Sequence, residues 1–323
     1  MRVRGSVIVI TGASSGIGRA AALSFARAGA VVVLVARRAE ALETVAEECR
    51  EKHGAEALPV ALDVTDAAAV DGLAQRVVDR FGRIDGWVNN ASVSAFGAFQ
   101  DIPLEDMRRV LDINVMGYVH GCRSALEVMR EQRHGVLVNV ASVVGVIPQP
   151  YAVPYTMSKF AVRALSLALR QEVRLEKMSG VKVCAVLPSG IDTPLFGQAA
   201  NYSGRKVRAM PPVYAPERVA RTIVDLMRVP RREVVVGTAG RALALQYKFA
   251  PRLTERALAV QVNRAHLSRK WTAPRAAGNL HSPAAGPGTV HGGFHGRRRT
   301  VVRRLATVGM LLALVRLRRR HTS

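Results

Sequence analysis

Three residues near the middle of the chain have the types and spacing needed to move a proton to or from a substrate oxygen. Tyr155 and Lys159 are four residues apart, so on a helix they lie on one face, one turn from each other. A free tyrosine, with a pKa of about 10, is a poor proton shuttle near neutral pH. A neighbouring ammonium is expected to lower that pKa toward the working range. Ser142, 13 residues before Tyr155, can hold the substrate oxygen beside the phenol, an arrangement suited to carbonyl reduction.

A glycine-rich turn near the start of the chain has the composition of a phosphate-binding loop. The apolar run Val7–Ile10 is followed by Thr11–Gly18, with the sequence TGASSGIG, and then by a helical pattern. Glycines let the backbone approach a ligand, and a helix N-terminus offers free N–H groups to a pyrophosphate. The spacing G-x-x-x-G-x-G differs from the standard dinucleotide fingerprint. We predict a nucleotide site here; the alternative is a strand–helix packing turn that binds nothing.

Seven apolar, β-branched runs alternate with six helical patterns, and these elements must position the residues above. The alternation predicts an α/β fold with a doubly wound, Rossmann-type parallel sheet covered by helices on both faces. The predicted strands are Val7–Ile10, Val31–Val35, Leu58–Leu62, Ile84–Val88, Val136–Val140, Val181–Leu187 and Glu233–Val236. The predicted helices are Gly18–Ala28, Ala39–His53, Ala67–Phe81, Leu104–Arg130, Tyr155–Lys177 and Pro216–Met227.

These motifs, in this order, resemble the classical short-chain dehydrogenase/reductase (SDR) family over about residues 3–238. Besides the glycine turn and Tyr-x-x-x-Lys, Asn89-Asn90-Ala91 resembles the family's Asn-Asn-Ala-Gly turn, with Ser92 in place of the last glycine. The resemblance implies a catalytic group of Asn114, Ser142, Tyr155 and Lys159. In the family this Asn distorts its helix and holds a water in a proton relay to the Lys. The alternative for Asn114 is a buried polar group that packs between helices.

The residues after the second predicted strand bear on the choice of cofactor. The strand ends in Ala36, followed by Arg37 and Arg38, and no carboxylate stands there to hold the ribose hydroxyls of NAD. A guanidinium can pair with a 2′-phosphate through its fork of donors. We therefore predict NADP(H) as the preferred cofactor, with NAD(H) as the alternative. If neither binds there, the two arginines only solvate the edge of the sheet.

The resemblance also implies a set of cofactor contacts along the chain. Asp63 would lie by the adenine, while the Ile191 backbone and the Thr193 hydroxyl would bond the nicotinamide carboxamide. Ser189 stands where the family has glycine, in the stretch that starts at Pro188. The predicted cofactor-binding residues are Gly12, Ser14, Ser15, Gly16, Ile17, Gly18, Arg37, Arg38, Asp63, Val64, Asn90, Ala91, Tyr155, Lys159, Pro188, Ile191 and Thr193.

The substrate side is predicted to be mainly apolar. The resemblance makes Leu195–Pro212, with Phe196 and Tyr202, a lid over the substrate. Its cations Arg205, Lys206 and Arg208 are expected to face water; the alternative is that they attract an anionic substrate. A mainly apolar lining favours a medium-sized apolar carbonyl or alcohol. The other residues expected to line the pocket are Val143, Val144, Ile147, Gln149 and Tyr151.

Composition excludes several other classes of protein. The chain has 323 residues, 49% of them hydrophobic and 22% charged, which excludes wholesale disorder. Cys49, Cys122 and Cys184 lie far apart, which excludes a disulfide scaffold and a CxxC metal site. No secretory signal is visible at the N-terminus, so we expect a cytoplasmic protein.

The net charge of +23 is unevenly distributed and divides the chain. Residues 241–323 hold 17 Lys and Arg and one acid, Glu255, a net +16, which leaves +7 for residues 1–240. We predict a catalytic domain over residues 1–240, and a helical extension plus a Gly/Pro/His-rich linker over residues 241–296. Residues 297–323 are predicted to form a basic, hydrophobic tail. The expected helices of the extension lie within Ala242–His266, and the linker is Ala273–Gly296.

The tail carries nine arginines around the apolar run Leu305–Val315. Such a run is too short to span a bilayer, which takes about 20 residues. An interfacial helix on an anionic membrane surface is the favoured interpretation; self-association, packing on the protein's own body and a disordered arm are the alternatives. The scarcity of aromatic residues argues against nucleic acid as a partner. His291 and His295 are separated by helix-breaking glycines, and no metal site is expected.

The sequence therefore supports two functional hypotheses. The first is an NADP(H)-dependent oxidoreductase that interconverts a carbonyl and an alcohol on a small, mainly apolar molecule. The second is an NADPH-binding scaffold or sensor that its tail brings to a membrane or a partner. The intact Asn-Ser-Tyr-Lys group favours the first. By resemblance to the family we also expect a homo-oligomer, a dimer or a tetramer.

Overall fold

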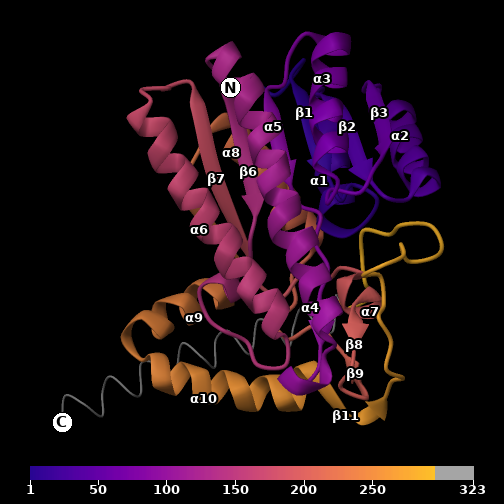
Figure 1. Cartoon of the computed structure of the whole chain (residues 1–323), viewed down its shortest axis with the longest axis vertical. Helices are drawn as coiled ribbons and strands as arrows, with labels where there is room; N and C mark the ends of the chain where they lie inside the picture. Colours follow the sequence, from indigo (N-terminus) through magenta and orange to yellow (C-terminus); the bar gives the residue numbers. More distant parts are fainter. Residues whose placement is uncertain (295–323) are drawn as a thin grey trace.

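Seven parallel strands form the central sheet of the protein, seen in a computed structural model that describes residues 1–294 (Figure 1). The strand order is β10-β7-β6-β4-β1-β2-β3, which reverses direction between β1 and β4. The predicted Rossmann-type α/β fold is confirmed. The strands are β1 (Val7–Thr11), β2 (Val31–Ala36), β3 (Ala57–Ala61), β4 (Gly86–Asn89), β6 (Gly135–Val140), β7 (Val181–Pro188) and β10 (Glu233–Val236).

Alternating side chains of the strands fill two separate cores, one on each face of the sheet. Ile8 and Ile10 of β1 pack with residues of α1, α2 and α8, whereas Val7 and Val9 pack on the other face with residues of α3, α5 and α6. A strand buried on both faces needs apolar residues at nearly every position, which explains the continuous runs in the sequence. The helices are α1 (Gly16–Arg27), α2 (Ala39–His53), α3 (Ala67–Phe81), α5 (Gly117–Gln132), α6 (Val153–Leu175) and α8 (Pro216–Arg228).

The segment predicted as one helix over Leu104–Arg130 is interrupted. Helix α4 (Leu104–Leu111) passes into a π-helical turn, η2 (Asp112–Met116), before α5 begins. Asn114 lies in this turn and is fully buried, with its side-chain amide bonded to the backbone of Val93. A π turn inserts one extra residue and re-aims the side chains around it. The prediction of one unbroken helix was therefore wrong, whereas the distortion of the helix at Asn114 that the family resemblance implied is present.

A smaller set of elements lies beyond the carboxyl ends of the strands, in the lower part of Figure 1. Two short helices, α9 (Thr238–Phe249) and α10 (Pro251–Gln261), are followed by a π turn, η4 (Val262–His266). Strand β11 (Leu267–Thr272) pairs antiparallel with β9 (Arg205–Val207), which ties this extension to the predicted lid. The remaining short elements are β5 (Ala95–Phe96), η1 (Phe99–Asp101), η3 (Val143–Gly145), α7 (Leu195–Gln198) and β8 (Ala200–Asn201).

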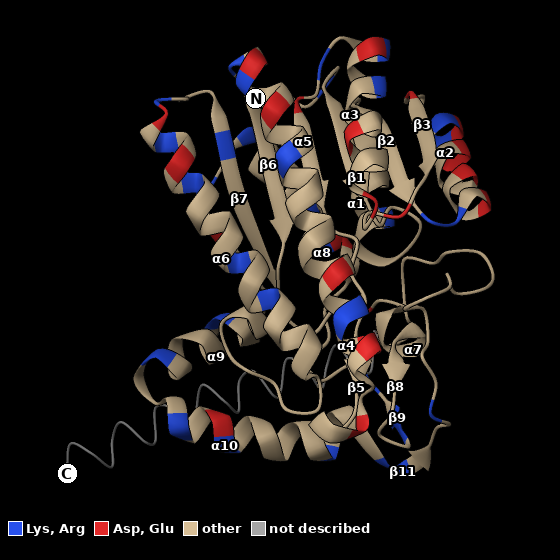
Figure 2. Cartoon of the chain, viewed as in Figure 1, with Lys and Arg blue, Asp and Glu red and all other residues tan. Residues whose placement is uncertain are grey.

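After β11, residues 276–294 contain no helix or strand and cross the same edge of the sheet; we call this segment the strap. In Figure 1 it is the orange to yellow loop beside α7. Leu280 anchors the strap in an apolar cluster and is completely buried. Figure 2 shows mostly basic charge on the extension, in contrast to the mixed charges of the core helices. His295 and the predicted tail, residues 297–323, lie outside the described residues.

Among residues 1–294, none of the helices combines the length and hydrophobicity that crossing a membrane requires.

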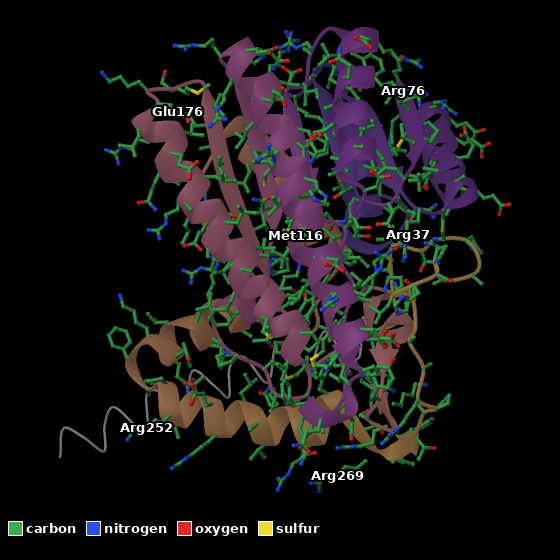
Figure 3. The ribbon with its side chains drawn as sticks, viewed as in Figure 1. Arg37, Arg76, Met116, Glu176, Arg252 and Arg269 are labelled. Atoms are coloured by element: carbon green, nitrogen blue, oxygen red, sulfur yellow. The ribbon has the colours of Figure 1, made fainter. Side chains whose placement is uncertain are left out.

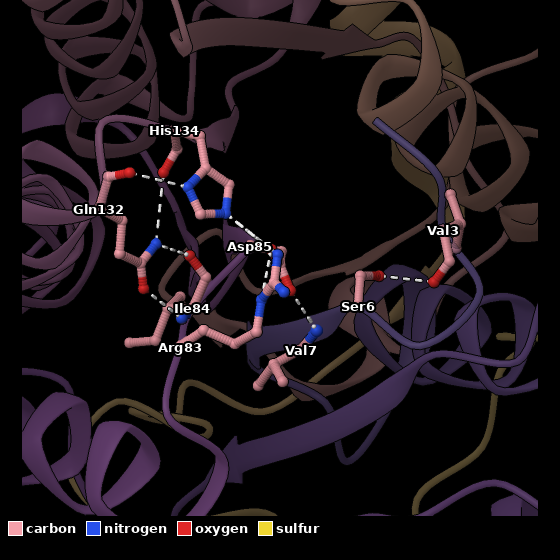
Figure 4. Close-up of polar contacts among 8 residues, drawn as sticks. All are labelled: Val3, Ser6, Val7, Arg83, Ile84, Asp85, Gln132 and His134. Atoms are coloured by element: carbon pink, nitrogen blue, oxygen red, sulfur yellow. Dashed lines mark hydrogen bonds and ion pairs between the residues drawn. The ribbon is translucent and has the colours of Figure 1, made fainter.

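The opposite edge of the sheet is held by a polar cluster around Asp85 (Figure 4). Its carboxylate accepts the buried Val7 N–H at 2.9 Å and also bonds Arg83 and His134. Gln132 bonds both backbone groups of Ile84, its side-chain oxygen accepting at 2.8 Å and its amide donating at 2.9 Å. The cluster joins the start of β1 to the start of β4, about one strand length from the cavity described below. We infer a purely structural role.

Replacing Asp85 with Ala should lower the free energy of unfolding by about 1–3 kcal/mol, because the Val7 N–H is left buried without an acceptor. Urea denaturation followed by circular dichroism measures the change. Glu56→Ala, which removes an exposed ion pair with Arg80, is the matched control and should change stability by less than about 1 kcal/mol. Equal losses in the two variants would contradict a structural role for the Asp85 cluster.

Candidate active site

One cavity collects residues from the carboxyl ends of β1, β2, β4, β6 and β7. Ligands of doubly wound sheets bind in this position, where the strand order reverses. The predicted residues that line the cavity are Gly12, Ser14, Ser15, Gly16, Ile17, Arg37, Arg38, Asp63, Val64, Asn90, Ala91, Ser142, Tyr155, Lys159, Pro188, Ile191 and Thr193. Gly18 and Asn114 are absent from the lining.

The glycine turn has the close packing that its sequence predicts. A Cβ on Gly12 would lie 2.8 Å from the Ala91 Cα, and a Cβ on Gly18 would overlap the Gly12 carbonyl oxygen. Gly16 has a positive φ of 55°, which a side chain would strain. The Asn90 amide donates to the Thr11 carbonyl at 2.9 Å and so joins the turn to the end of β4. Gly12 and Gly18 therefore allow close packing within the turn, and Gly16 allows the left-handed backbone at the start of α1.

Ser142 and Tyr155 meet at the end of β6 and the start of α6. The Ser142 hydroxyl accepts the Val144 N–H at 3.1 Å, which fixes its direction. Burial raises the pKa of Tyr155 to about 12, and a hydrogen bond with Ser142 acts in the opposite direction. The expectation of a lowered tyrosine pKa is therefore wrong here, because burial outweighs every favourable contact. At neutral pH this tyrosine is a protonated phenol.

Lys159 is almost completely buried, one helical turn after Tyr155. Its ammonium donates to the Val140 carbonyl at 3.0 Å and lies 5.5 Å from the centre of the Tyr155 ring. Burial lowers the pKa of Lys159 to about 7. The cation has few acceptors around it, so a small change in its surroundings is enough to change its charge near neutral pH.

Asn114 reaches the catalytic helix through a serine. Its amide donates to the Ser158 hydroxyl at 3.0 Å, and Ser158 donates to the Tyr155 carbonyl at 2.7 Å. The other amide contacts of Asn114 are to both backbone groups of Val93. Asn114 is thus placed beside the tyrosine's turn of helix, where it joins the β4 loop to α6.

Arg37 and Arg38 lie at the other end of the cavity, as the cofactor prediction requires, but they also bind the strap. Arg37 donates to the Leu280 carbonyl at 3.1 Å and to the Asn279 carbonyl at 2.6 Å. Arg38 donates to the Gly286 carbonyl at 2.8 Å. Burial lowers the pKa of both guanidinium groups. Figure 3 labels Arg37 next to the strap. These contacts, more than 240 residues apart in sequence, were not predicted.

Asp63 is also held at this end. Burial alone would raise its pKa, but hydrogen bonds from Thr65 and Arg109 outweigh burial and lower the pKa. The Arg109 contact is an ion pair of 2.6 Å. Asp63 is therefore a charged carboxylate whose position is fixed beside Arg37.

Ser189, which replaces the family's glycine, is accommodated by a second glycine. Its hydroxyl donates to the Val236 carbonyl at 2.9 Å. Gly237 follows with a φ of 113°, and a Cβ there would overlap the Ser189 hydroxyl oxygen. Gly237 therefore provides the space that the serine occupies, and Pro188, Ile191 and Thr193 still line the cavity.

The remaining wall of the cavity, next to Tyr155, is largely apolar. Of the residues expected to line it, Val143, Val144 and Gln149 do so. Ile147 does not, because it is buried against Leu258 and Val262 of the extension, and Tyr151 is likewise absent from the lining. Further residues of this wall are Phe96, Leu195, Phe196, Met210 and His266.

His266 is a site residue that sequence reasoning missed. It comes from the extension, outside the region of family resemblance, and no local motif marks it. Its Nδ1 bonds the Arg208 carbonyl, and its ring makes edge contacts with Phe96 and Phe196. Burial lowers the pKa of His266 to about 4, so the imidazole is neutral at physiological pH.

Arg205 corrects one expectation about the lid. Its guanidinium bonds the Ser268 carbonyl at 3.0 Å and the Asn263 side-chain oxygen at 2.7 Å, so it joins the lid to the extension instead of facing water. Lys206 and Arg208 are exposed, as expected. The three lid cations thus have different roles, and Arg205 holds β9 against β11.

Three buried side-chain oxygens in the described part of the chain have no hydrogen-bond partner, and all three belong to residues that line this cavity. They are the hydroxyls of Ser92 and Ser94 and the amide oxygen of Asn279. Buried polar atoms are normally bonded, and exceptions need an explanation. Together with the glycine turn and the arginines, these atoms fit a polar ligand of the size of a nicotinamide dinucleotide.

Comparisons with known proteins agree with this geometry. The family model for short chain dehydrogenases matches residues 6–202. An uncharacterized oxidoreductase of Bacillus subtilis, YxnA, is 35% identical over 88% of this chain and 80% of its own length. Dehydrogenase/reductase SDR family member 7B of Bos taurus is 33% identical over 83% of this chain and 84% of its own length. Both alignments cover more than 240 residues of this chain, so the sequence similarity continues beyond residue 240 into the extension.

Two solved structures are similar in fold and hold nicotinamide nucleotides. A short-chain dehydrogenase/reductase from Burkholderia phymatum in complex with NAD has a TM-score of 0.71 and 28% identity, covering 78% of this chain and 96% of that one. The alcohol dehydrogenase of Thermococcus sibiricus complexed with 5-hydroxy-NADP has a TM-score of 0.63 and 27% identity, with coverages of 72% and 96%. With the sheet, the glycine turn and the Ser-Tyr-Lys group already in place, these matches establish that the chain belongs to the short-chain dehydrogenase family of oxidoreductases.

Proposed function

We propose that the protein is an NADP(H)-dependent oxidoreductase that interconverts a carbonyl and an alcohol on a small, mainly apolar molecule. One observation carries the proposal: Ser142, Tyr155 and Lys159 line the same cavity as the glycine turn and Arg37. A cofactor stretched between the two ends therefore places its nicotinamide near the phenol. When bound, the cofactor supplies or accepts the hydride.

Tyr155 is the proposed general acid of the reduction. Its raised pKa keeps the phenol protonated, so at neutral pH it is ready to donate to a substrate oxygen. Ser142, oriented by the Val144 N–H, binds the same oxygen and holds it beside the phenol. The protonated phenol is the form that carbonyl reduction requires, whereas oxidation of the alcohol requires the phenolate.

Lys159 is the proposed source of the positive charge that stabilises the phenolate left after proton transfer. Its ammonium lies beside the Tyr155 ring and is held by the Val140 carbonyl. Asn114, through Ser158, keeps the turn of helix that carries Tyr155 against the β4 loop. Asn114 is therefore a positioning residue in this mechanism.

The preference for NADP(H) rests on the charges after β2. Arg37 and Arg38 line the cavity, and Asp63, whose charge acts on Arg37, is engaged by Arg109. An anionic 2′-phosphate gains from two guanidinium groups, whereas the ribose hydroxyls of NAD have no free carboxylate to bond.

Tyr155→Phe should abolish carbonyl reduction, by about 10²–10⁴-fold or more, because the proton donor is lost. NADPH affinity, measured by fluorescence titration, should stay within about threefold of the wild type. Tyr247→Phe, which removes an exposed hydroxyl that bonds Glu255, is the matched control and should be fully active. Wild-type levels of turnover in Tyr155→Phe would exclude the proposed acid, and NADPH binding without turnover on any carbonyl would favour the sensor hypothesis.

Arg37→Ala should weaken NADPH binding about 10-fold or more relative to NADH binding, since a charge-assisted hydrogen bond is worth about 1.5–3 kcal/mol. The ratio of the two dissociation constants is the readout, because loss of the strap contact affects both nucleotides equally. Arg76→Ala, at an exposed position on α3 (Figure 3), is the control. An unchanged ratio would show that Arg37 does not read the phosphate.

Lys159→Met should alter the pH dependence of stability. The folded chain releases the Lys159 proton near pH 7, whereas a lysine in the unfolded chain keeps it to about pH 10.5. Unfolding in this window takes up a proton, so the wild type gains stability relative to the variant as the pH rises. From pH 7 to pH 9.5 we expect a gain of about 3 kcal/mol in urea denaturation.

The control for this experiment is Lys182→Met, at an exposed position of β7, for which the difference from the wild type should not change with pH. A constant difference for Lys159→Met would mean that the buried ammonium keeps its charge across the whole range.

A further inference from the structure

We propose that the strap, residues 276–294, is part of the cofactor site: it closes over the adenosine-phosphate end of bound NADP(H), and the nucleotide leaves only when the strap is released. This inference rests on the proposed function. None of the strap lies within the residues that the family model matches.

The strap holds the cofactor arginines without neutralising them. Its carbonyl oxygens accept from Arg37, from Arg38 and, at Gly288, from Arg19. Carbonyl groups orient a guanidinium but bring no net charge. Among the described residues Arg19 pairs with Glu48, but no carboxylate lies within ion-pair distance of Arg37 or Arg38. The strap therefore orients the guanidinium groups of Arg37 and Arg38 while their positive charges remain available to bind an anion.

The strap also forms part of the cavity wall. Asn279, Pro283 and Ala284 line the same cavity as Arg37 and Tyr155. The strap is thus one wall of the cavity beside Arg37, which favours a nucleotide whose adenosine end lies against the strap over one that replaces it. The unpartnered Asn279 side-chain oxygen is buried in this wall and can accept from an adenine amino group or a ribose hydroxyl.

Both ends of the strap are anchored to the core. At the first end, Leu280 is buried with Val64 and Val93, and His281 bonds Asp106 at 2.6 Å. At the second end, Asp192 accepts the Phe294 N–H at 2.6 Å and the Gly292 N–H at 3.1 Å. The strap thus runs from the adenosine side of the cavity to the residue before Thr193, along the whole predicted path of the phosphates.

Between the anchors the strap touches the glycine turn. The Gly16 N–H donates to the Thr289 carbonyl at 2.8 Å, and a Cβ on Gly288 would overlap the Ser14 carbonyl oxygen. The strap is therefore in direct contact with the turn at Ser14 and Gly16, and it has to shift from this contact for a phosphate to bind there. The Thr289 carbonyl also takes up one of the free N–H groups at the N-terminus of α1, which a phosphate would otherwise bond. The experiment must therefore distinguish a strap that retains the nucleotide from one that excludes it.

The test measures NADPH release from the full-length protein. NADPH is bound, an excess of NADP⁺ is added, and the loss of protein-bound NADPH fluorescence is followed by stopped flow. Leu280→Ala removes the first anchor and should speed release about 10-fold or more. Asn279→Ala, which leaves the anchors intact, should speed it about threefold or more. Leu253→Ala, at an exposed position of α10, is the matched control and should release NADPH at the wild-type rate.

A second readout does not depend on fluorescence or turnover. Chymotrypsin cleaves after leucine and aromatic residues, and Leu280 and Phe294 lie in the strap. Saturating NADPH should slow cleavage after these residues about 10-fold or more in the wild type. In Leu280→Ala, where Phe294 is the remaining site of the two, NADPH should slow cleavage after Phe294 less than in the wild type.

Three other outcomes would contradict the proposed role of the strap. Unchanged release in both variants, or cleavage that NADPH does not slow, would show that the strap does not retain the nucleotide. NADPH-dependent turnover of the wild type would be unaffected by that result. Tighter NADPH binding in Leu280→Ala would mean that the strap excludes the nucleotide, which would also contradict the proposed role of the strap. If the wild type binds neither NADPH nor NADH, the proposed function itself fails, and the proposed role of the strap fails with it.

Discussion

The hydrogen bond from the Lys159 ammonium to the Val140 carbonyl joins the two halves of the proposed catalytic group. Val140 is the last residue of β6, and Lys159 lies two turns into α6. A buried cation needs an acceptor, so this contact fixes the helix against the edge of the sheet. Because Tyr155 is one turn before Lys159 and Ser142 follows Val140 closely, the same contact sets the distance between the hydroxyl groups. The charge near the proposed acid and the position of that acid thus depend on one interaction.

Much of the fold was visible in the sequence because its signals are local. Continuous apolar runs marked the strands of the central sheet, and the bounds of α2 and α3 were predicted to the residue. The positions of Ser142 and Tyr155 followed from spacing within one strand–loop–helix unit. The apolar spacing did not show the π turn at Asn114, because the side chain there bonds Val93, 21 residues away in the sequence. A distortion of the helix at this residue was implied by the family resemblance alone.

Features that depend on distant contacts or on burial could not be predicted. The composition of residues 276–294 indicates only that regular structure is absent, whereas the Arg37–Leu280 contact joins positions 243 residues apart. His266 enters the cavity only because β11 pairs with β9. The i, i+4 spacing correctly made Tyr155 and Lys159 neighbours, but it does not indicate solvent exposure. The predicted direction of the tyrosine pKa was therefore wrong: the sequence pattern shows the charge, and only the structure shows the desolvation.

The extension packs on the loop after β6, which lies between the proposed catalytic residues Ser142 and Tyr155. Ile147, which lies between Ser142 and Tyr155, is buried against Leu258 and Val262, and His266 forms part of the apolar wall. The shape of this end of the cavity is therefore determined partly by residues after position 240, which carry none of the catalytic group. Such an arrangement lets substrate preference diverge while the reacting residues stay the same. Relatives sorted by their catalytic motifs alone would then be grouped together, and the sequence of the extension would be the better guide to which of them share a substrate.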